Sequence, residues 1–417
     1  MFNKERPRSA AIRIGLNDST FGLLGAAILL FGAVLWSARG PNVEKTDFSL
    51  TYVGARIVHQ GLGSRLYDLD LQKRVRDSLF RHPNPLFFEH PPFEALLLSP
   101  LAALPFRTAY LVWGFLNAAV WLLLIFLMRP HLPAPLEDLG YVALWLLFAP
   151  LGVALYQGQS SMILLALYAT AFVLLRHDNN FVAGAALGLG LFKFQFVLPF
   201  VVIFLFRKQW RFLGGFCLTA LLLGLLSLLT TGWLGIVTYI RFLLAIGRTP
   251  QNLSYGSAVD MPTIHGFIYA MVGRNISHFG LSITVLALSV GLLLFIARRW
   301  NSLHQSSGDN LIFAAALAGS LLSGVHMFTH DFSPLLLAMF LALASLPHRS
   351  HRGLLTAMIF TLVIFWLPPV YFVLVAFHGM YLMCPVLGLF AISAVLSGKY
   401  AGQALSRENH QLEVLRS

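Results

Sequence analysis

The sequence predicts an all-α integral membrane protein, with residues 1–417 forming a single polytopic helical bundle. Hydrophobic residues make up 57% of the chain and charged residues 11%, and the mean hydropathy of +0.74 is far above that of soluble domains. Apolar runs recur along the whole length, each close to the ~20 residues that a helix needs to cross the hydrocarbon core. Helices are expected because a helix satisfies the hydrogen bonds of its own backbone groups, for which the hydrocarbon core offers no partners.

Basic residues flank the apolar runs and predict the topology. The formal net charge is +12, from 29 Lys and Arg against 17 Asp and Glu. Lys and Arg favour the cytoplasmic ends of spans, so the excess reflects membrane orientation rather than nucleic-acid binding. Counting from the N-terminus places the clusters that flank spans on one side and predicts roughly 12 spans with both ends inside. These clusters are Lys4 to Arg13, Arg207 to Arg211, Arg298–Arg299, His348–Arg352 and Lys399. The first outside loop also carries Arg and Lys, interleaved with Asp, but long folded loops are poor reporters of orientation.

The expected elements follow in order along the chain. The first span is followed by an outside loop over about residues 40–90, and a second outside segment covers about residues 230–279. A hairpin at Gln157–Gln159 joins two spans, or it re-enters the membrane, which would change the count. The expected spans up to the second segment are Phe21–Ala38, Pro92–Leu104, Leu111–Met128, Tyr141–Leu155, Met162–Leu175, Phe181–Phe206 and Leu213–Leu229.

The first outside loop is predicted to contain two short amphipathic helices. Phe48, Tyr52 and Ala55 recur at helical spacing, as do Leu66 and Leu69. We expect both helices to lie on the outer membrane surface, with Tyr67–Asp68 in the turn between them.

Polar residues near the ends of the spans gather on the outer side. Asp47 begins the first loop, Arg248, Asp260 and His265 lie in the second segment, and His326–Asp331 forms a late turn. Ionisable residues in or beside spans are costly and usually line a cavity or substrate path. Asp260 and Arg248 also fit an ordinary solvated pair.

Asp47 has two interpretations. An acidic residue there can cap the N-terminus of a helix, or it can act as a general base on a substrate arriving from water. The sequence spacing does not distinguish these two roles. The roles are compatible, because a helix N-terminus stabilises an ionised carboxylate.

Lys193 lies about twelve residues from either end of an apolar run. Placing an ammonium there costs at least ~2.5 kcal/mol on insertion scales. Snorkelling is difficult from that depth. A cavity that holds an anion, such as a lipid phosphate, is the favoured explanation.

His326, His330 and Asp331 have the spacing of a partial metal site, since an i,i+4 histidine pair faces one side of a helix. No third ligand follows at motif spacing. The outer side is rich in basic groups and poor in carboxylates, so we expect substrate contacts rather than metal ligation. No cofactor is predicted.

Several stretches resemble glycosyltransferase family 87, whose members use polyprenyl-phosphate mannose. The resemblance covers most of the chain up to about Leu337. Its motifs are Asp47–Phe48 with Tyr52 and Gly54–Arg56, Gly61 to Asp68, His90 to Leu101, Gly158–Gln159, Ala183–Gly184 with Lys193–Gln195, Met261–Gly266, and Ser323–Asp331.

The resemblance implies a GT-C-type bundle of the cell inner membrane that transfers a hexose, with mannose expected, on the outer face. The donor is a polyprenyl-phosphate sugar, the acceptor a glycolipid or glycan, and the reaction inverting, with Asp47 as base. Donor phosphate binding is assigned to Lys193, Arg248 and His330. The expected substrate-orienting residues are Tyr52, Arg56, Gln159, Gln195, His265, His326 and Asp331. The alternative function is a lipid or solute transporter, or a flippase, without catalysis.

Overall fold

The computed structural model describes residues 18–131, 138–248, 258–273, 275–300, 307–324, 326–345 and 352–398. Helices form nearly all of the regular structure in this part of the chain, and no strand occurs in it. The helices before the second outside segment are α1 (Asp18–Arg39), α2 (Asp47–His59), α3 (Leu69–Leu79), α4 (Pro92–Leu98), α5 (Phe106–Met128), α6 (Asp138–Leu146), α7 (Ala149–Gln157), α8 (Ser161–Arg176), α9 (Asn180–Gly188), α10 (Phe194–Phe206) and α11 (Trp210–Arg248). The later helices are α13 (Ile264–Val272), α14 (His278–Arg299), α15 (Ser307–Leu322), α16 (Leu335–Ala344), α17 (Arg352–Trp366) and α18 (Pro368–Ala376).

Six helices among the described residues are long and apolar enough to cross a membrane, or eight if two bent pairs each form one span. This confirms a helical membrane protein but not the expected count of roughly 12. Four further apolar helices have only 10–17 residues. At 1.5 Å per residue they rise ~15–26 Å, less than the ~30 Å of a typical hydrocarbon core.

The expected span Tyr141–Leu155 and a later apolar segment, the long run from Leu354 to Phe377, are both broken at prolines. Gly140–Leu146 meets Ala149–Gln157 at 49°, where Pro150 falls in the first turn of the second helix. Arg352–Trp366 meets Pro368–Ala376 at 84°, before a pair of prolines. Proline lacks the N–H that would continue the preceding helix, so each break follows from the local sequence.

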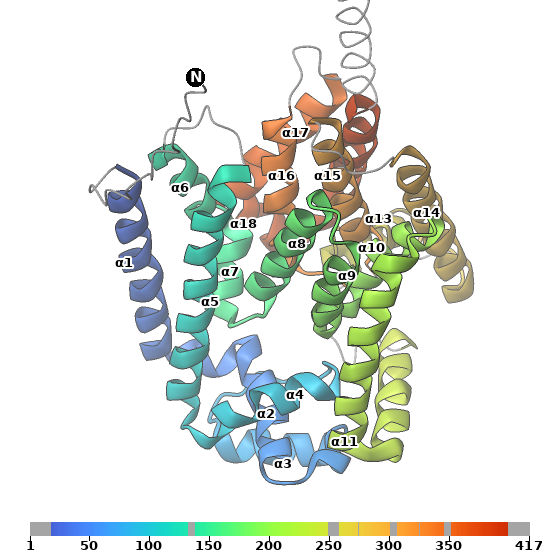
Figure 1. The fold of residues 1–417 in the computed structure, drawn as a ribbon. Coiled ribbons are helices and arrows are strands. Elements are labelled where there is room, and N and C mark those ends of the chain that lie inside the picture. Colours follow the sequence, from blue (N-terminus) through green and yellow to red (C-terminus); the bar gives the residue numbers. More distant parts are fainter. Residues whose placement is uncertain are drawn as a thin grey trace, which may run out of the picture.

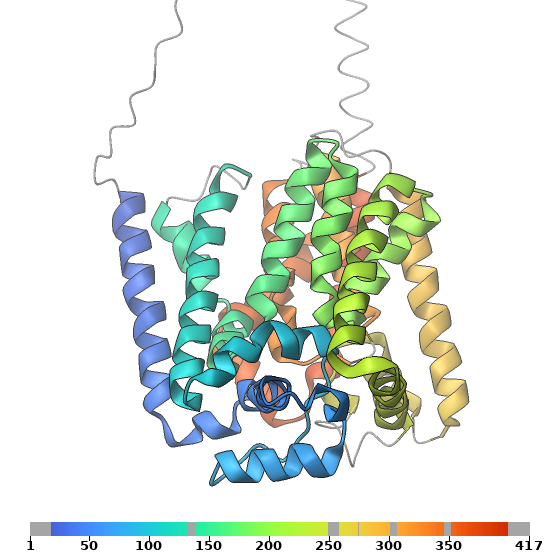
Figure 2. The same ribbon diagram turned by 60° about the horizontal axis from the view of Figure 1, so that its bottom comes forward.

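The expected outer loop forms a layer across one end of the bundle, with α2, α3 and α4 at the bottom of Figures 1 and 2. Both expected loop helices are present, and Tyr67 and Asp68 lie between them. However, α2 does not lie on a surface. Its residues Phe48 to Ala55 are all buried, and the helix packs against α4 and the 3-10 helix Ser99–Ala103.

The prediction that Pro92–Leu104 forms a short membrane span is also wrong. Its residues form α4 and the 3-10 helix Ser99–Ala103, and Figure 1 shows α4 lying crosswise to α5. Apolar composition alone does not separate a helix that crosses a bilayer from one that packs beneath the bundle.

Two helix interruptions matter for the site. A 3-10 helix, Leu189–Lys193, separates α9 from α10 in the middle of an apolar segment. In α11, Gly232 has non-helical backbone angles (φ 70°, ψ 173°), close to Thr230 where the second outside segment was expected to begin. Beyond this break, Tyr239 stacks on Tyr67 of the first loop with ring centroids 4.6 Å apart.

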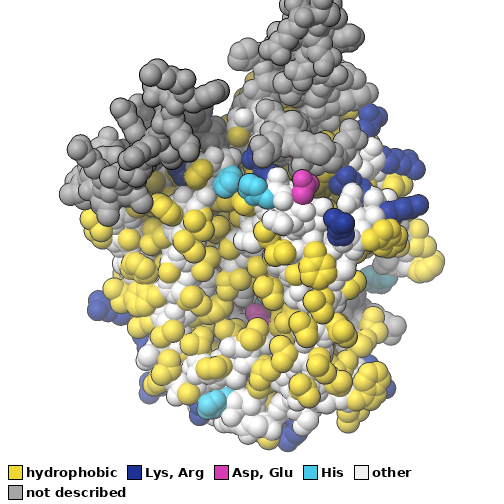
Figure 3. Space-filling view, viewed as in Figure 1, with side chains coloured by type: hydrophobic (Ala, Val, Ile, Leu, Met, Phe, Trp, Pro, Cys, Tyr) yellow, Lys and Arg dark blue, Asp and Glu magenta, His cyan; other side chains and the backbone are white. Residues whose placement is uncertain are grey.

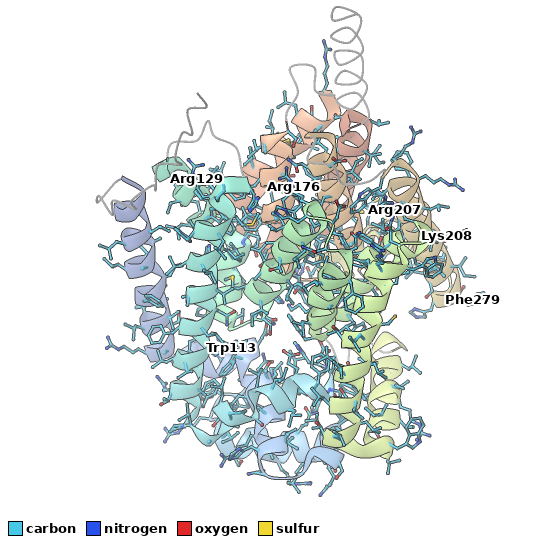
Figure 4. The ribbon with its side chains drawn as sticks, in the orientation of Figure 1. Trp113, Arg129, Arg176, Arg207, Lys208 and Phe279 are labelled. Carbon is cyan, nitrogen blue, oxygen red and sulfur yellow. The ribbon has the colours of Figure 1, made fainter. Side chains whose placement is uncertain are left out.

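Basic side chains gather at the opposite end of the bundle from α2–α4. Figure 4 shows Arg129, Arg176, Arg207 and Lys208 there, and we call this the basic end. In Figure 3 a broad hydrophobic band lies below it. This separation is typical of a protein that spans a membrane.

Helices α9 and α11 pack closely along each other, and glycines of each helix lie against the backbone of the other. A Cβ on Gly215 would lie 1.9 Å from the carbonyl oxygen of Phe181, and one on Gly184 would lie 1.9 Å from that of Phe212. Small residues of this kind allow helix backbones to approach closely within a membrane.

We therefore expect Gly215→Ala to lower the Tm of the detergent-solubilised protein, with a cost of ~1–3 kcal/mol from overpacking. Gly224→Ala in the same helix is the matched control, because a Cβ there meets nothing within 4 Å. Equal Tm values for the two variants would contradict this account of the contact.

Candidate active site

A sharp turn at the end of α7 supplies one side of the site. Gly158 has a left-handed φ of 65°. Its N–H donates to Leu155 O at 3.2 Å, and the N–H of Gln159 donates to Ala154 O at 2.9 Å. These two bonds form a Schellman motif, in which glycine avoids the steric cost of a left-handed conformation. Trp113 of α5, labelled in Figure 4, donates its indole N–H to Gly158 O at 2.8 Å.

The same turn holds the start of α2. The ring of Phe48 lies among Phe106, Tyr110 and Trp113, with centroid separations of 5.9–6.3 Å. A Cβ on Gly158 would lie 2.7 Å from the Cβ of Phe48. Glycine is thus required here both for its backbone angles and for this close approach, which fixes Asp47, the residue before Phe48.

Asp47 forms hydrogen bonds with residues far from it in the sequence rather than capping its own helix. Its backbone N–H donates to Gln157 Oε1 at 3.1 Å, and its Oδ2 accepts from Gln159 Nε2 at 2.7 Å. The N-cap of α2 is Thr46, whose hydroxyl donates instead to Val43 O. The Asp47 side chain is 18% exposed, so it is held in place and still reachable.

Lys193 is buried and ion-paired with Asp331. Its ammonium also donates to Gln159 Oε1 at 3.0 Å and to Ser161 Oγ at 3.2 Å. An ammonium has three donors, and all three have partners here. Asp331 is held in turn by the backbone N–H of Phe328, which donates to its Oδ2 at 3.0 Å.

The lysine determines how the Gln159 amide is oriented. An ammonium can only donate, so the amide oxygen must face Lys193 and the NH₂ group must face Asp47. A hydrogen bond donated to a carboxylate favours its ionised form. The second carboxylate oxygen, Oδ1, receives no hydrogen bond from the described residues.

His330 closes a ring of polar side chains. Its Nδ1 lies 3.9 Å from Asp47 Oδ2, and its Nε2 lies 3.5 Å from Asp331 Oδ1. The 3-10 helix Thr329–Phe332, which carries His330 and Asp331, packs against α7. We call these residues the polar ring, and its members are Asp47, Gln159, Lys193, Asp331 and His330.

A second buried network adjoins the polar ring, and sequence reasoning missed it. Glu94 is 5% exposed, accepts from Ser160 Oγ at 3.2 Å and contacts His90 Nδ1 at 2.6 Å. Burial lowers the pKa of His90, but the charge and hydrogen bond of Glu94 outweigh it, so the pKa is raised overall. The spacing of His90 and Glu94, four residues apart around two prolines, was the available signal.

Other predicted residues lie elsewhere. Tyr52 and Arg56 donate to Leu104 O at 2.6 Å and to Ala102 O at 2.7 Å, so they hold the 3-10 helix Ser99–Ala103 in place. Gln195 is half-buried in the first turn of α10 and makes none of the contacts of the polar ring. The side chain of Arg248 lies outside the described part of the structure.

The Oδ1 of Asp260 lies 2.6 Å from His378 Nδ1, and its expected pairing with Arg248 involves a side chain outside the described part of the structure. His265 and His326 interact electrostatically, and burial together with His326 lowers the pKa of His265. Each has a buried ring nitrogen with no hydrogen-bond partner among the described residues, His265 Nδ1 and His326 Nε2. Unsatisfied buried nitrogens of this kind are free to accept or donate to a substrate hydroxyl.

Comparison with known proteins links this arrangement to one family. The model of glycosyltransferase family 87 matches residues 87–329 of the chain. The match includes Glu94, Gln159 and Lys193, whereas Asp47 precedes it and His330 and Asp331 follow it directly. Searches of curated proteins and of solved structures gave no match.

The Lys193–Asp331 pair gives a stability prediction. We expect Lys193→Met to destabilise the protein by ~3–5 kcal/mol, because it leaves a carboxylate buried without its counter-charge. The double variant Lys193→Met with Asp331→Asn should recover part of this loss, since no unpaired charge remains. Unfolding in detergent followed by circular dichroism measures both, and equal destabilisation of the two variants would contradict the pairing argument.

Proposed function

The chain belongs to glycosyltransferase family 87, and from this membership and the polar ring we propose an inverting hexosyl transfer with Asp47 as base. The donor is a polyprenyl-phosphate hexose, with mannose the expected sugar, and the acceptor is a hydroxyl of a glycolipid or glycan. The observation that supports this most directly is the Asp47 carboxylate, partly exposed and held by Gln159.

The reaction follows from that carboxylate. Asp47 removes the proton of the acceptor hydroxyl as its oxygen attacks the anomeric carbon from the face opposite the phosphate. The bond between the anomeric carbon and the phosphate oxygen breaks, and the phosphate leaves with the electron pair. A β-linked donor would therefore give an α-linked product. Gln159 donates a hydrogen bond to one carboxylate oxygen of Asp47 and so holds the proposed base in position.

The leaving phosphate needs positive charge or hydrogen-bond donors rather than a strong general acid. We propose that His330 and Arg248 supply them, with His265 and His326 orienting sugar hydroxyls. Lys193, expected from the sequence to bind the phosphate directly, is better explained as a positioning residue. Its three N–H groups are already occupied by Gln159, Ser161 and Asp331.

We also propose that the α2–α4 end faces away from the cytoplasm. The support is that the residues of the basic end directly flank spans, whereas the Lys and Arg of α2 and α3 belong to a long folded loop, which reports orientation poorly. Lipid-linked donors would then reach Asp47 from the outer leaflet. Transport without catalysis, the alternative from the sequence, is not favoured, because the family is one of glycosyltransferases.

The purified protein, given polyprenyl-phosphate mannose and membrane glycolipids as acceptors, should form a new glycosidic product detectable by mass spectrometry. Asp47→Asn should lower turnover by ~10²–10⁴-fold, the usual contribution of a general base. Donor binding should be largely retained, because the amide keeps the shape of the carboxylate.

Asp70→Asn is the matched control for this prediction, since Asp70 is an exposed carboxylate on α3 of the same loop. Turnover close to that of the unaltered protein in Asp47→Asn would remove Asp47 from the mechanism. If the protein formed the product equally well from a nucleotide sugar, the assignment of a lipid-linked donor would be contradicted instead.

We further expect transfer to survive chelation. Basic side chains can neutralise the leaving phosphate, and hard cations prefer oxygen ligands. The test is the initial rate in excess EDTA, with and without Mg²⁺ or Mn²⁺ added back. Complete loss that either ion restores would show that a divalent metal assists and would make Asp331 a candidate ligand.

A further inference from the structure

An open depression at the basic end, called the cavity below, lies where three candidate membrane spans terminate. Asn180–Phe206 ends there, Trp210–Ala245 begins there and His278–Arg299 ends there. The cavity has a volume of about 500 Å³. Its polar lining is Arg207, Gln209 and Arg298, and its apolar lining includes Phe206, Leu294 and Trp300.

The turn between α10 and α11 fixes the shape of this cavity. Lys208 adopts a left-handed φ of 55°, which is uncommon outside glycine. Backbone bonds from Lys208 to Leu205 O and from Gln209 to Phe204 O, both 3.0 Å, hold the turn. The flanking residues Arg207 and Gln209 both line the cavity.

Aromatic packing holds the arginine as well. The guanidinium of Arg207 lies 5.1 Å from the ring centroid of Trp300, a cation–π contact. Trp300 packs edge-on against Phe204 at 5.1 Å, and Phe204 stacks on Phe212. The wall that carries Arg207 is therefore built from buried rings rather than from mobile surface groups.

We propose that this cavity binds the phosphate headgroup of an anionic membrane lipid. Guanidinium groups match phosphate oxygens in geometry and charge, and basic pockets between transmembrane helices recognise anionic headgroups. A lipid is the occupant rather than free phosphate, because the cavity is bordered by spans and flanked by exposed apolar side chains. Leu205 is 49% exposed and Trp210 is 66% exposed.

This site is distinct from the polar ring. Arg207 and Lys208 lie at the basic end in Figure 4, whereas Asp47 begins α2 at the other end of the bundle. The proposal therefore does not depend on the donor or on the chemistry at Asp47. It assigns the basic end a binding role beyond orienting the chain in the membrane.

The test uses the full chain, purified in mild detergent with a mixture of phosphatidylglycerol and phosphatidylcholine. Native mass spectrometry counts the phosphatidylglycerol retained as the mixture is diluted. Arg298→Gln should weaken retention about fivefold, the factor expected from losing one basic contact at a membrane surface. Arg298 is exposed, so its substitution should leave the fold intact.

Arg299→Gln is the matched control, because it removes the same charge one residue away and does not line the cavity. Equal loss in both variants would mean that the lipid is held by general surface charge and would overturn the proposal. Unchanged lipid retention in Arg298→Gln would also overturn the proposal. Displacement of the lipid by millimolar inorganic phosphate would overturn it as well, because it would indicate a site for the free anion. Weaker retention of phosphatidylglycerol in Arg298→Gln but not in Arg299→Gln would support the proposed site.

Discussion

The buried ion pair between Lys193 and Asp331 is the interaction on which the candidate active site depends. Each partner would be too costly to bury alone, and together they still need further hydrogen bonds to offset their desolvation. Gln159 and Ser161 supply these to the lysine, and the backbone of Phe328 supplies one to the aspartate. The consequence is that Gln159 has only one orientation, and that orientation directs its NH₂ group toward Asp47.

Irregular backbone surrounds this pair on three sides, and at Lys193 it interrupts a segment that the sequence predicted as one continuous span. Lys193 ends a 3-10 helix, Gly158 turns the chain after α7, and Asp331 lies in a second 3-10 helix. Non-helical backbone at membrane depth is tolerated only where it is buried in protein or lines a cavity. These three breaks are thus mutually dependent, because each one presents a side chain that satisfies the polar groups of another.

The sequence was sufficient to predict the helical membrane class. The family resemblance added Gln159 to the expected site, and span counting put Asp47, His330 and Asp331 on one side. The hydrophobicity of the chain predicts the helical membrane class. The alternating direction of successive spans predicts which residues lie on the same side of the membrane. The partner of Lys193 could not be predicted, because ion pairing depends on tertiary contacts rather than on spacing. Hydrophobicity also failed for Pro92–Leu104, since a buried crosswise helix is as apolar as a span. The contacts of Tyr52 and Arg56 with Leu104 O and Ala102 O could not be predicted, because sequence patterns do not reveal the 3-10 helix Ser99–Ala103 or the residue that follows it.

The separation of Lys193 from Asp331 along the chain has a consequence for biogenesis. The two residues are 138 positions apart, so the lysine enters the membrane long before its counter-charge is synthesised. An uncompensated lysine at the centre of a span costs ~2.5–3.5 kcal/mol on insertion scales. Gln159 and Ser161 precede it in the chain and are already in place to solvate it. Gln159 and Ser161, on the hairpin after α7, can therefore hydrogen-bond the ammonium before Asp331 is synthesised, and the ion pair forms only when the late turn is in place.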